Sequence, residues 1–401
     1  MKHKFRFSGS VSLPPSWLPV LGIFLSLRAS AFQSVYLRKN IVSQQTSALH
    51  MYTTFYRSPC PHEDLPHSRK SLVRLWQIRS DQQHTEDYFR FIEGKEEPDK
   101  CDQASVIIGK GKLGQALVQW GGMGEDDLLL GRDDCIPTVL TVSNGCTLNM
   151  FPIYVCVPEW EVESVILGCP KEKRNDLVFM QSACLETLLK RYGLANKKTT
   201  QCLPYFSISP FGLPVEGRVQ YDVSKTDGEP KFAGQTVVCG TWRGAVAERL
   251  RKQDLHVEVM DYTYWRKHML ERLLFDSLFG LLACVHADSG EKTYGELAQN
   301  HWEEIDDMVW ELSRAIANIM AVVLLTHVER RVRGLAEGPH WRDRKPQMPT
   351  CREYPFRNGM LRSLSRSFTS RGFPSPMPTH DEYLDFVRER KLVSYDVDQD
   401  I

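Results

Sequence analysis

A glycine-rich turn that follows a short apolar run constrains the fold more than any other stretch of the sequence. The letters SVII at 105–108 have the length and the branched side chains of a buried strand. Gly109, Gly111 and Gly114 then form the pattern G-x-G-x-x-G, and the letters GQALVQW at 114–120 have the character of a short helix. A strand, this glycine pattern and a helix, in that order, are the context of a dinucleotide-binding loop.

Each glycine of such a loop has its own physical role. Gly109 allows a tight turn, the missing side chain at Gly111 lets a pyrophosphate approach the backbone, and Gly114 lets helix and strand pack closely. The helix N-terminus offers unpaired N–H groups and partial positive charge to the phosphates. The cofactor-binding residues expected here are Gly109, Lys110, Gly111, Lys112, Leu113 and Gly114. The alternatives are a glycine turn without a ligand and two lysines that are merely exposed.

The end of the next expected strand bears on the choice between NAD and NADP. An acidic residue about 20 positions beyond the loop favours NAD, and an arginine favours NADP. The letters LLLGRDD place Arg132 there, followed by Asp133. Arg132 suits a bidentate contact with a 2′-phosphate. Asp133 suits a ribose hydroxyl instead, but we favour NADP(H) as the cofactor.

Strand-like and helix-like stretches alternate from 103 to 261. The strands are expected at 105–109, 127–131, 138–144, 150–158, 176–182, 236–240 and 256–260. The helices between them are expected at 114–120, 159–167, 184–193 and 245–253. Such alternation predicts an α/β fold with a mostly parallel sheet. We therefore expect an N-terminal Rossmann domain over 103–261.

Beyond this domain the pattern is helical, so an all-α C-terminal domain is expected over 262–393. Apolar residues recur at helical spacing from 263 to 286, and one or two more helices are expected over 294–332. Met308, Leu312, Ile316 and Ile319 form an apolar stripe that we assign to the core. A loop at 338–355, a surface helix at 380–393 and an acidic tail at 394–401 complete the chain.

The first 62 residues have the composition of a targeting segment, and a polar lead-in at 63–102 follows them. They contain no Asp or Glu, and they begin with basic residues before the apolar run WLPVLGIFLSL at 17–27. This run is too short to span a bilayer, and Ala29-Ser30-Ala31 fits a signal-peptide cleavage site. With Phe32 next, the segment resembles the bipartite signal and transit presequence of algae with complex plastids. The expected location is the plastid stroma, and the alternative is the secretory pathway.

The charge balance and the cysteines bear on which partners and which compartment the protein has. Lysine plus arginine and aspartate plus glutamate each total 50, so no basic excess favours nucleic acid as a partner. The 11 cysteines form no CxxC pair and show no zinc-finger spacing, so no metal site is expected from them. Several lie in apolar runs, which favours buried free thiols in a reducing compartment. No membrane partner is expected for the mature form.

Several stretches between 105 and 320 resemble the ketopantoate reductase family of the 6-phosphogluconate-dehydrogenase-like superfamily. The opening GxGxxG with Arg132 is the most specific match. The letters IYVCVPEWEVESVI, DLVFMQSACLE and the long run from VVCGTWRG to FGLL match later signatures by pattern. The resemblance implies a nicotinamide-dependent reductase of a small 2-oxo acid, with a homodimer as a possible assembly.

The resemblance also points to catalytic positions, several of which differ here. The family lysine and its two asparagines fall on Arg272, Asp276 and Gly280, and the asparagine of the "QNG" signature falls on Ser182. Ser182 is therefore a candidate for contact with the nicotinamide or its ribose. A family glutamate corresponds to Glu311.

The proton donor must be another residue, because arginine does not deprotonate usefully in proteins. His268, Arg272 and Asp276 share one helix face at i, i+4 and i+8. His268 is a candidate donor with Arg272 as a carboxylate clamp, and Lys267 is an alternative donor. A surface stripe with an Arg272–Asp276 ion pair is the competing interpretation.

The sequence therefore predicts an NADP-dependent oxidoreductase that acts on a small anionic 2-oxo or 2-hydroxy acid. The first alternative is a catalytically degenerate NADP-binding regulatory or scaffold protein. The second is a structural protein that binds nothing.

Overall fold

The computed structural model describes residues 100–121, 126–131, 134–215, 221–222, 232–290 and 293–397. The chain divides into two compact units, and all of these residues belong to the unit Leu75–Ile401. The predictions about the presequence at 1–62, most of the lead-in at 63–102, Arg132 and Asp133 lie outside the described residues. Among the helices described, none combines the length and the apolar character needed to cross a bilayer.

A seven-stranded sheet forms the first half of the described chain, in the order β11-β10-β7-β6-β5-β1-β2. Its strands are β1 Val106–Ile108, β2 Leu128–Leu130, β5 Ile153–Val155, β6 Leu177–Phe179, β7 Thr200–Leu203, β10 Thr236–Cys239 and β11 Val257–Val259. Neighbouring strands pair in parallel except β7 with β10, which are antiparallel. The expected α/β fold with a mostly parallel sheet is confirmed.

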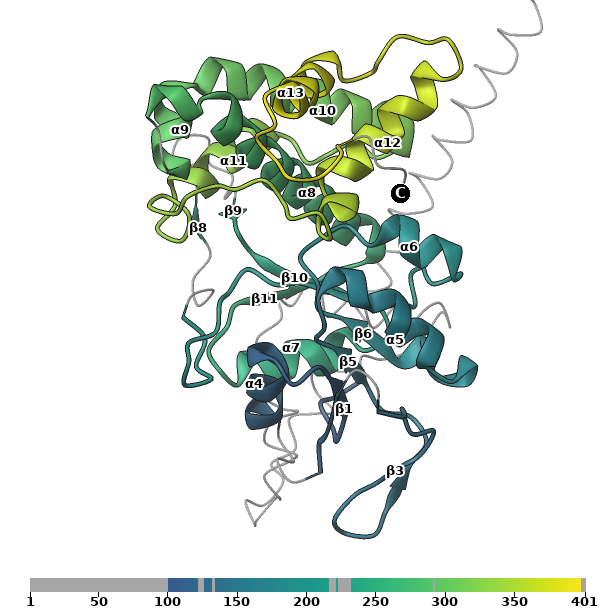
Figure 1. Cartoon of the computed structure of the whole chain (residues 1–401). Coiled ribbons are helices and arrows are strands. Elements are labelled where there is room, and N and C mark those ends of the chain that lie inside the picture. The colour runs from purple at the N-terminus through teal and green to yellow at the C-terminus, as the bar shows by residue number, and fades with distance from the viewer. Residues whose placement is uncertain are drawn as a thin grey trace, which may run out of the picture. The chain divides into compact units, whose positions relative to one another are not determined.

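Helices connect and follow the strands. Within the sheet region they are α4 Lys112–Trp120, α5 Val162–Gly168, α6 Glu186–Arg191 and α7 Arg243–Arg251. From residue 262 onward they are α8 Tyr262–Val285, α9 Tyr294–Asn300, α10 Trp302–Met320, α11 Val328–Glu337, α12 Asn358–Thr369 and α13 Pro378–Glu389. The helices from α8 onward gather in the green to yellow part of the chain (Figure 1). The expected helical C-terminal region is confirmed.

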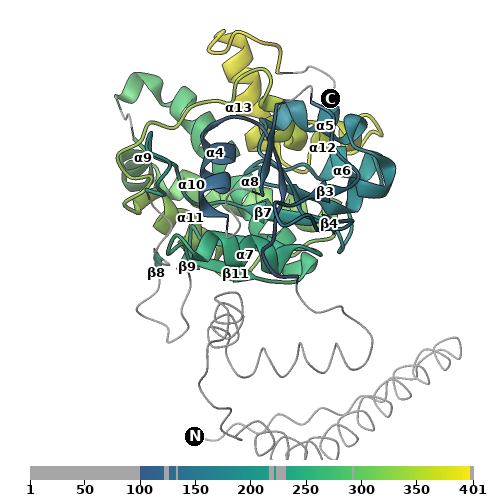
Figure 2. The same ribbon diagram turned by 90° about the horizontal axis from the view of Figure 1, so that it is seen from below.

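Both faces of the sheet are covered, which explains why its strands are apolar without alternation. Val106 and Ile108 pack on one face with residues of α5 and α6, while Ile107 packs on the other face with residues of α4 and α7. Figure 2 shows the strands between the pair α5 and α6 and the helix α7. The same division places α4, with the glycine loop before it, against β1.

A buried arginine fixes α7 to the amino ends of the first strands. Arg249 is 1% exposed, and its guanidinium contacts Asp102 at 2.9 Å and Asp127 at 3.1 Å. It also donates to the hydroxyl of Ser105 at 3.0 Å, just before β1. A buried charge is stable only when it is paired, so this cluster holds the residues before β1 and β2 in place. The glycine loop follows at the other end of β1.

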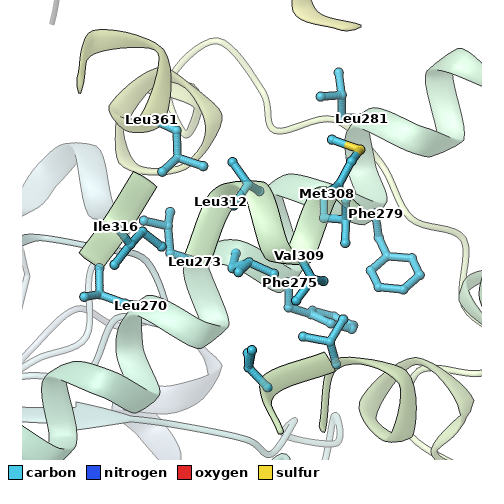
Figure 3. Packing of buried hydrophobic residues seen from close by; sticks show 14 of the residues in the cluster. Leu270, Leu273, Phe275, Phe279, Leu281, Met308, Val309, Leu312, Ile316 and Leu361 are labelled. Atoms are coloured by element: carbon cyan, nitrogen blue, oxygen red, sulfur yellow. The ribbon is translucent and has the colours of Figure 1, made fainter. Parts of the chain in front are cut away.

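The second core lies between α8 and α10. The Asp261 side chain caps α8 by accepting hydrogen bonds from the backbone N–H groups of Thr263 and Tyr264. Figure 3 shows the apolar residues of α8 and α10 pointing toward one another. Met308, Leu312 and Ile316 are at most 1% exposed, and Ile319 packs partly buried against them. The expected apolar stripe is therefore core.

The structure differs from the sequence expectations in several elements. The segment 138–144 does not join the sheet but forms a separate hairpin of β3 Leu140–Thr141 and β4 Thr147–Leu148, because Asn144 and Gly145 make its turn. Gly145 has a φ of +80°. Strand β7 and helix α12 were not expected, and the region 294–332 holds α9, α10 and the start of α11. A second small hairpin joins β8 Tyr221–Asp222 to β9 Phe232–Ala233.

The segment 338–357, which precedes α12, crosses α8 closely. A β-carbon added at Gly280 would lie 2.6 Å from the backbone oxygen of Gln347. No side chain fits between two backbones at that distance, which accounts for glycine at the position where the family resemblance implies asparagine. The expected loop at 338–355 is therefore seated on α8 by backbone contact.

Candidate functional site

The turn between β1 and α4 requires two of its three glycines for steric reasons. Gly109 has a φ of +114°, and a β-carbon there would lie 2.6 Å from the backbone oxygen of Cys156. A β-carbon at Gly114 would lie 1.9 Å from the backbone oxygen of Gly109. Gly109 therefore permits the turn beside the end of β5, and Gly114 permits the close packing of α4 on that turn.

Gly111, by contrast, is not required by the fold. Its φ of −76° and ψ of −178° suit any residue, and an added β-carbon would meet nothing within 4 Å. It is the N-cap of α4, no side chain caps this helix end, and the first turn carries no acidic residue. The open space above Gly111 therefore adjoins backbone N–H groups and the positive end of a helix dipole, the environment that binds phosphate in proteins.

This loop lies at the point where the strand order reverses. Strand β1 pairs with β2 on one side and with β5 on the other, so the connections from β1 and from β2 leave in opposite directions. The N–H of Cys156 donates to the backbone oxygen of Ile108 at 2.8 Å, which joins the carboxyl ends of β1 and β5. In open parallel sheets, ligands bind in the crevice at such a switch point.

The other predicted residues of the loop lie beside Gly111 in the chain. Lys110 is exposed and pairs with Asp134 at 3.5 Å, beyond the end of β2. The backbone N–H of Gly131 and the ammonium of Lys110 hold the pKa of Asp134 below its usual value. Lys112 is exposed, and Leu113 packs partly buried against the sheet core.

The carboxyl end of β6 reaches the same edge of the sheet. The side-chain amide of Gln181 donates to the backbone oxygens of Val155 and Val157 at 2.9 and 2.8 Å, which fixes the ends of β5 and β6 together. Ser182 follows and is partly buried. Two residues further, the N–H of Cys184 donates to the backbone oxygen of Phe356 at 3.4 Å. The segment before α12 thus meets this edge beside Ser182.

A chain of buried charges connects the sheet edge to α8. Arg272 and Asp276 of α8 pair at 2.9 Å, and Arg357 contacts the same Asp276 carboxylate at 2.9 Å. Arg357 also reaches Glu159, just after β5, at 3.5 Å. The four side chains are 6–19% exposed. Arg272–Asp276 is therefore a buried ion pair and not a surface stripe.

Aromatic rings enclose the guanidinium of Arg272. Its central carbon lies 4.9 Å from the ring centre of Tyr205 and 4.7 Å from that of Trp341. Burial alone would lower the pKa of Arg272, but the Asp276 carboxylate outweighs it and holds that pKa above its usual value. Burial raises the pKa of Tyr205 to about 12, against the opposing charge of Arg272. Arg272 therefore remains a cation and Tyr205 remains protonated at neutral pH.

The remaining predicted catalytic residues occupy other surroundings. Burial lowers the pKa of His268, and the charges that act on it come from Glu271, Arg331 and Glu258. The ammonium of Lys267 lies 5.3 Å from the exposed ring of Tyr264.

Glu311 accepts hydrogen bonds from the N–H groups of Thr379 and His380 at 3.0 Å, so it caps the start of α13. Among the contacts described, none joins Lys267, His268 or Glu311 to the buried charges around Asp276.

The arginines between 352 and 371 lie in a polar stretch that is typical of solvated charge, but Arg357 is not solvated. Its guanidinium is 19% exposed and bridges Asp276 and Glu159, which are 81 and 198 residues away in the chain. Nothing local in the sequence distinguishes Arg357 from its neighbouring arginines, since its partners are set by tertiary packing.

The fold and the loop together define a class, an α/β protein of Rossmann type with a helical C-terminal region. Known protein-family profiles give no match to the chain, and no curated protein matches it either. Among solved structures, a 2-dehydropantoate 2-reductase from Methylococcus capsulatus aligns with 10% identity over 75% of this chain and 99% of that chain, at a TM-score of 0.46.

Two further solved structures align over similar lengths. A dimeric ketopantoate reductase from Staphylococcus aureus has 12% identity, 72% coverage of this chain, 99% of its own and a TM-score of 0.42. A D-mandelate dehydrogenase in complex with NADH has 12% identity, the same coverages and a TM-score of 0.44. At such identities the likeness concerns the fold and assigns no residue a role.

Replacing Asp276 by Asn should destabilise the protein strongly. The change leaves the buried cations of Arg272 and Arg357 without their shared anion, and loss of one partner of a buried ion pair costs about 3–5 kcal/mol. Asp385→Asn is the matched control, since Asp385 also contacts two arginines, Arg362 and Arg388, but is 39% exposed. Urea unfolding measures both variants. Equal and small losses for the two would contradict the buried network.

Stability should also decrease with acid because of His340. Its ring contacts Trp341 edge-on at 4.9 Å and lies beside Arg344; burial first, then the Arg344 charge, lowers its pKa from 6.5 to about 4. The unfolded chain binds this proton near pH 6.5, so this contribution is present above pH 6.5 and is lost between pH 6.5 and about 4. The melting temperature of wild type should therefore fall relative to that of His340→Gln as the pH is lowered from 7 to 4. A difference in melting temperature that stays constant over this range would refute the assignment.

Proposed function

We propose that this chain is an NADP-dependent oxidoreductase that acts on a small 2-oxo or 2-hydroxy acid, as its resemblance to ketopantoate reductases implies. The proposal includes delivery to the plastid stroma by residues 1–62 and contact of Arg132 with the 2′-phosphate of the cofactor. The observation that carries it concerns Gly111, where the fold would accept a larger residue. This glycine is the N-cap of α4, and a helix N-terminus of this kind is suited to bind phosphate.

The substrate side of the proposal rests on the buried charges at the same sheet edge. Cys156, which touches the glycine turn, is three residues before Glu159, the last member of the charge network. A small carboxylate that enters here meets the guanidinium groups of Arg357 and Arg272. Such groups bind carboxylates in bidentate fashion and stabilise a developing oxyanion.

The reaction needs a hydride at the 2-oxo carbon and a proton at its oxygen, which together give the 2-hydroxy acid. The reduced nicotinamide supplies the hydride. Arg272 does not release a proton, so we assign the proton to the hydroxyl of Tyr205, which interacts with Arg272 by hydrogen bond. His268 and Lys267 are less suitable because their described contacts lie elsewhere. We assign Ser182 to contact with the nicotinamide ribose.

A second candidate function has its own support. Every charge of the network has an opposite partner within the chain, and Arg272 is enclosed by aromatic rings. A protein that binds NADP and performs no reduction would show the same arrangement. Binding and turnover must therefore be measured separately.

The cofactor proposal is tested by Gly111→Ala. The added methyl meets no atom of the protein, so the melting temperature should stay unchanged, but it occupies the space assigned to the pyrophosphate. We expect NADPH affinity, followed by nicotinamide fluorescence, to fall at least tenfold. Gly168→Ala is the matched control, because a β-carbon there also meets nothing and Gly168 ends α5, remote from the loop in sequence. Equal NADPH affinity in all three proteins would reject the binding site.

In the same titration Arg132→Ala should weaken NADPH more than NADH, with the exposed Arg314→Ala as its control. Equal loss for both cofactors would reject the 2′-phosphate contact while leaving the dinucleotide site intact.

The catalytic proposal is tested by Tyr205→Phe in an assay of NADPH oxidation with a panel of 2-oxo acids. Loss of one proton donor typically lowers the rate by about 10²–10⁴-fold, so we expect a fall in kcat with NADPH affinity retained. A variant as fast as wild type would reject Tyr205 as donor. NADPH binding without turnover of any acid in wild type would support the second candidate function.

A further inference from the structure

Two histidines and a glutamate meet where α8 ends and α10 begins, apart from the dinucleotide loop. His286 is the C-cap of α8, His301 is the N-cap of α10, and Glu304 lies in the first turn of α10. The Nε2 atom of His286 lies 2.7 Å from Oε2 of Glu304, and the Nδ1 atom of His301 lies 3.6 Å from the same oxygen. The two imidazole rings stack with their centres 3.7 Å apart.

Side-chain capping of α10 does not account for this arrangement. His301 occupies an N-cap position without capping the helix through its side chain, although Ser, Thr, Asp and Asn are the residues that satisfy such a position. Glu304 does not complete a capping box. Its Oε1 accepts a hydrogen bond from the hydroxyl of Tyr383, and its Oε2 faces both histidines.

The three side chains together are a set of ligands of the kind that binds a divalent transition-metal ion. Within the part of the chain that the structure describes, these three residues form the one group of its kind, with one ligand atom from each lying within 4.8 Å of the others. Metal–nitrogen and metal–oxygen bonds of about 2.0–2.2 Å place the ligands of a tetrahedral ion roughly 3.3 Å apart. The 3.6 Å pair is near that value. To bind one ion, the 2.7 Å pair must lengthen, and the two stacked rings must turn apart until both nitrogens face the ion.

The surroundings fit a metal site with one open position. The side chains of His286, His301 and Glu304 are 19%, 19% and 25% exposed, so a fourth ligand from solvent has access. Two histidines and one carboxylate are a known ligand set of zinc and of non-haem iron. The bond from Tyr383 orients the carboxylate as outer-shell partners of metal ligands do.

We propose that His286, His301 and Glu304 bind a divalent transition-metal ion of the zinc type, with water as the fourth ligand. The site is distinct from the proposed reductase site, because His286 follows Asp276 by ten residues on one helix, about 15 Å along its axis. Its ion joins the last turn of α8 to the first turn of α10, the two helices whose packing forms the C-terminal core.

The test uses the full chain without an affinity tag, stripped with a chelator and titrated with Zn²⁺ by calorimetry. We expect one equivalent to bind with micromolar affinity or better and to raise the melting temperature. His301→Ala and Glu304→Gln should each lower the affinity at least 100-fold, and Tyr383→Phe should lower it about 10–100-fold. His256→Ala is the matched control, since His256 also faces a carboxylate, that of Glu258 at 3.1 Å, and should leave Zn²⁺ binding unchanged.

Substitution with Co²⁺ identifies the ligands independently. A nitrogen and oxygen site gives the visible bands of tetrahedral Co²⁺ without strong thiolate charge transfer, whereas binding by the exposed cysteines would give that charge transfer. Circular dichroism shows whether each metal-free variant is folded. Equal Zn²⁺ affinity in wild type and folded His301→Ala, millimolar affinity in wild type, or a thiolate spectrum would each overturn the proposal. None of these results depends on NADP binding, so the two proposals stand or fall separately.

Discussion

The candidate site depends on the ion pairs that the carboxylate of Asp276 makes. Two buried arginines share it, one from the same helix and one from the segment before α12, and the second arginine continues to Glu159 at the sheet edge. Buried charges are tolerated only when they are paired and hydrogen-bonded. The helical region and the carboxyl edge of the sheet are therefore held in one relative position at the place where a dinucleotide and a small acid would meet.

Local patterns predicted the sheet region around the glycine loop well. The strand before Gly109, the helix after it and the parallel sheet follow from short apolar runs and glycine spacing, which act over a few residues. The same holds for the stripe on α10, whose helical period alone indicates its buried face. The segment 138–144 does not follow its local pattern. Its apolar letters suit a strand, but Asn144 and Gly145 make it turn back on itself before it can join the sheet.

The buried charges of the candidate site could be predicted only in part. The resemblance placed Arg272 and Asp276 on one helix face, and the structure brings them together, but their wider surroundings come from residues far apart in the chain. Arg357 is one of several arginines in a polar stretch, and only packing separates it from the others. Glu311 illustrates the reverse, since a glutamate that a family register marks as functional serves here to cap α13.

The sequence distance between the members of the charge network has a consequence for how the protein is made. Arg357 pairs with residues 81 and 198 positions earlier, so the ribosome adds this arginine long after both of its partners. Until then Asp276 and Glu159 lack this cation, and the sheet edge lacks the segment that contacts it beside Ser182. The glycine loop and its strands, by contrast, are synthesised early. During synthesis the glycine loop therefore precedes the charge network, and a nascent chain cannot hold the complete candidate site before Arg357 has emerged.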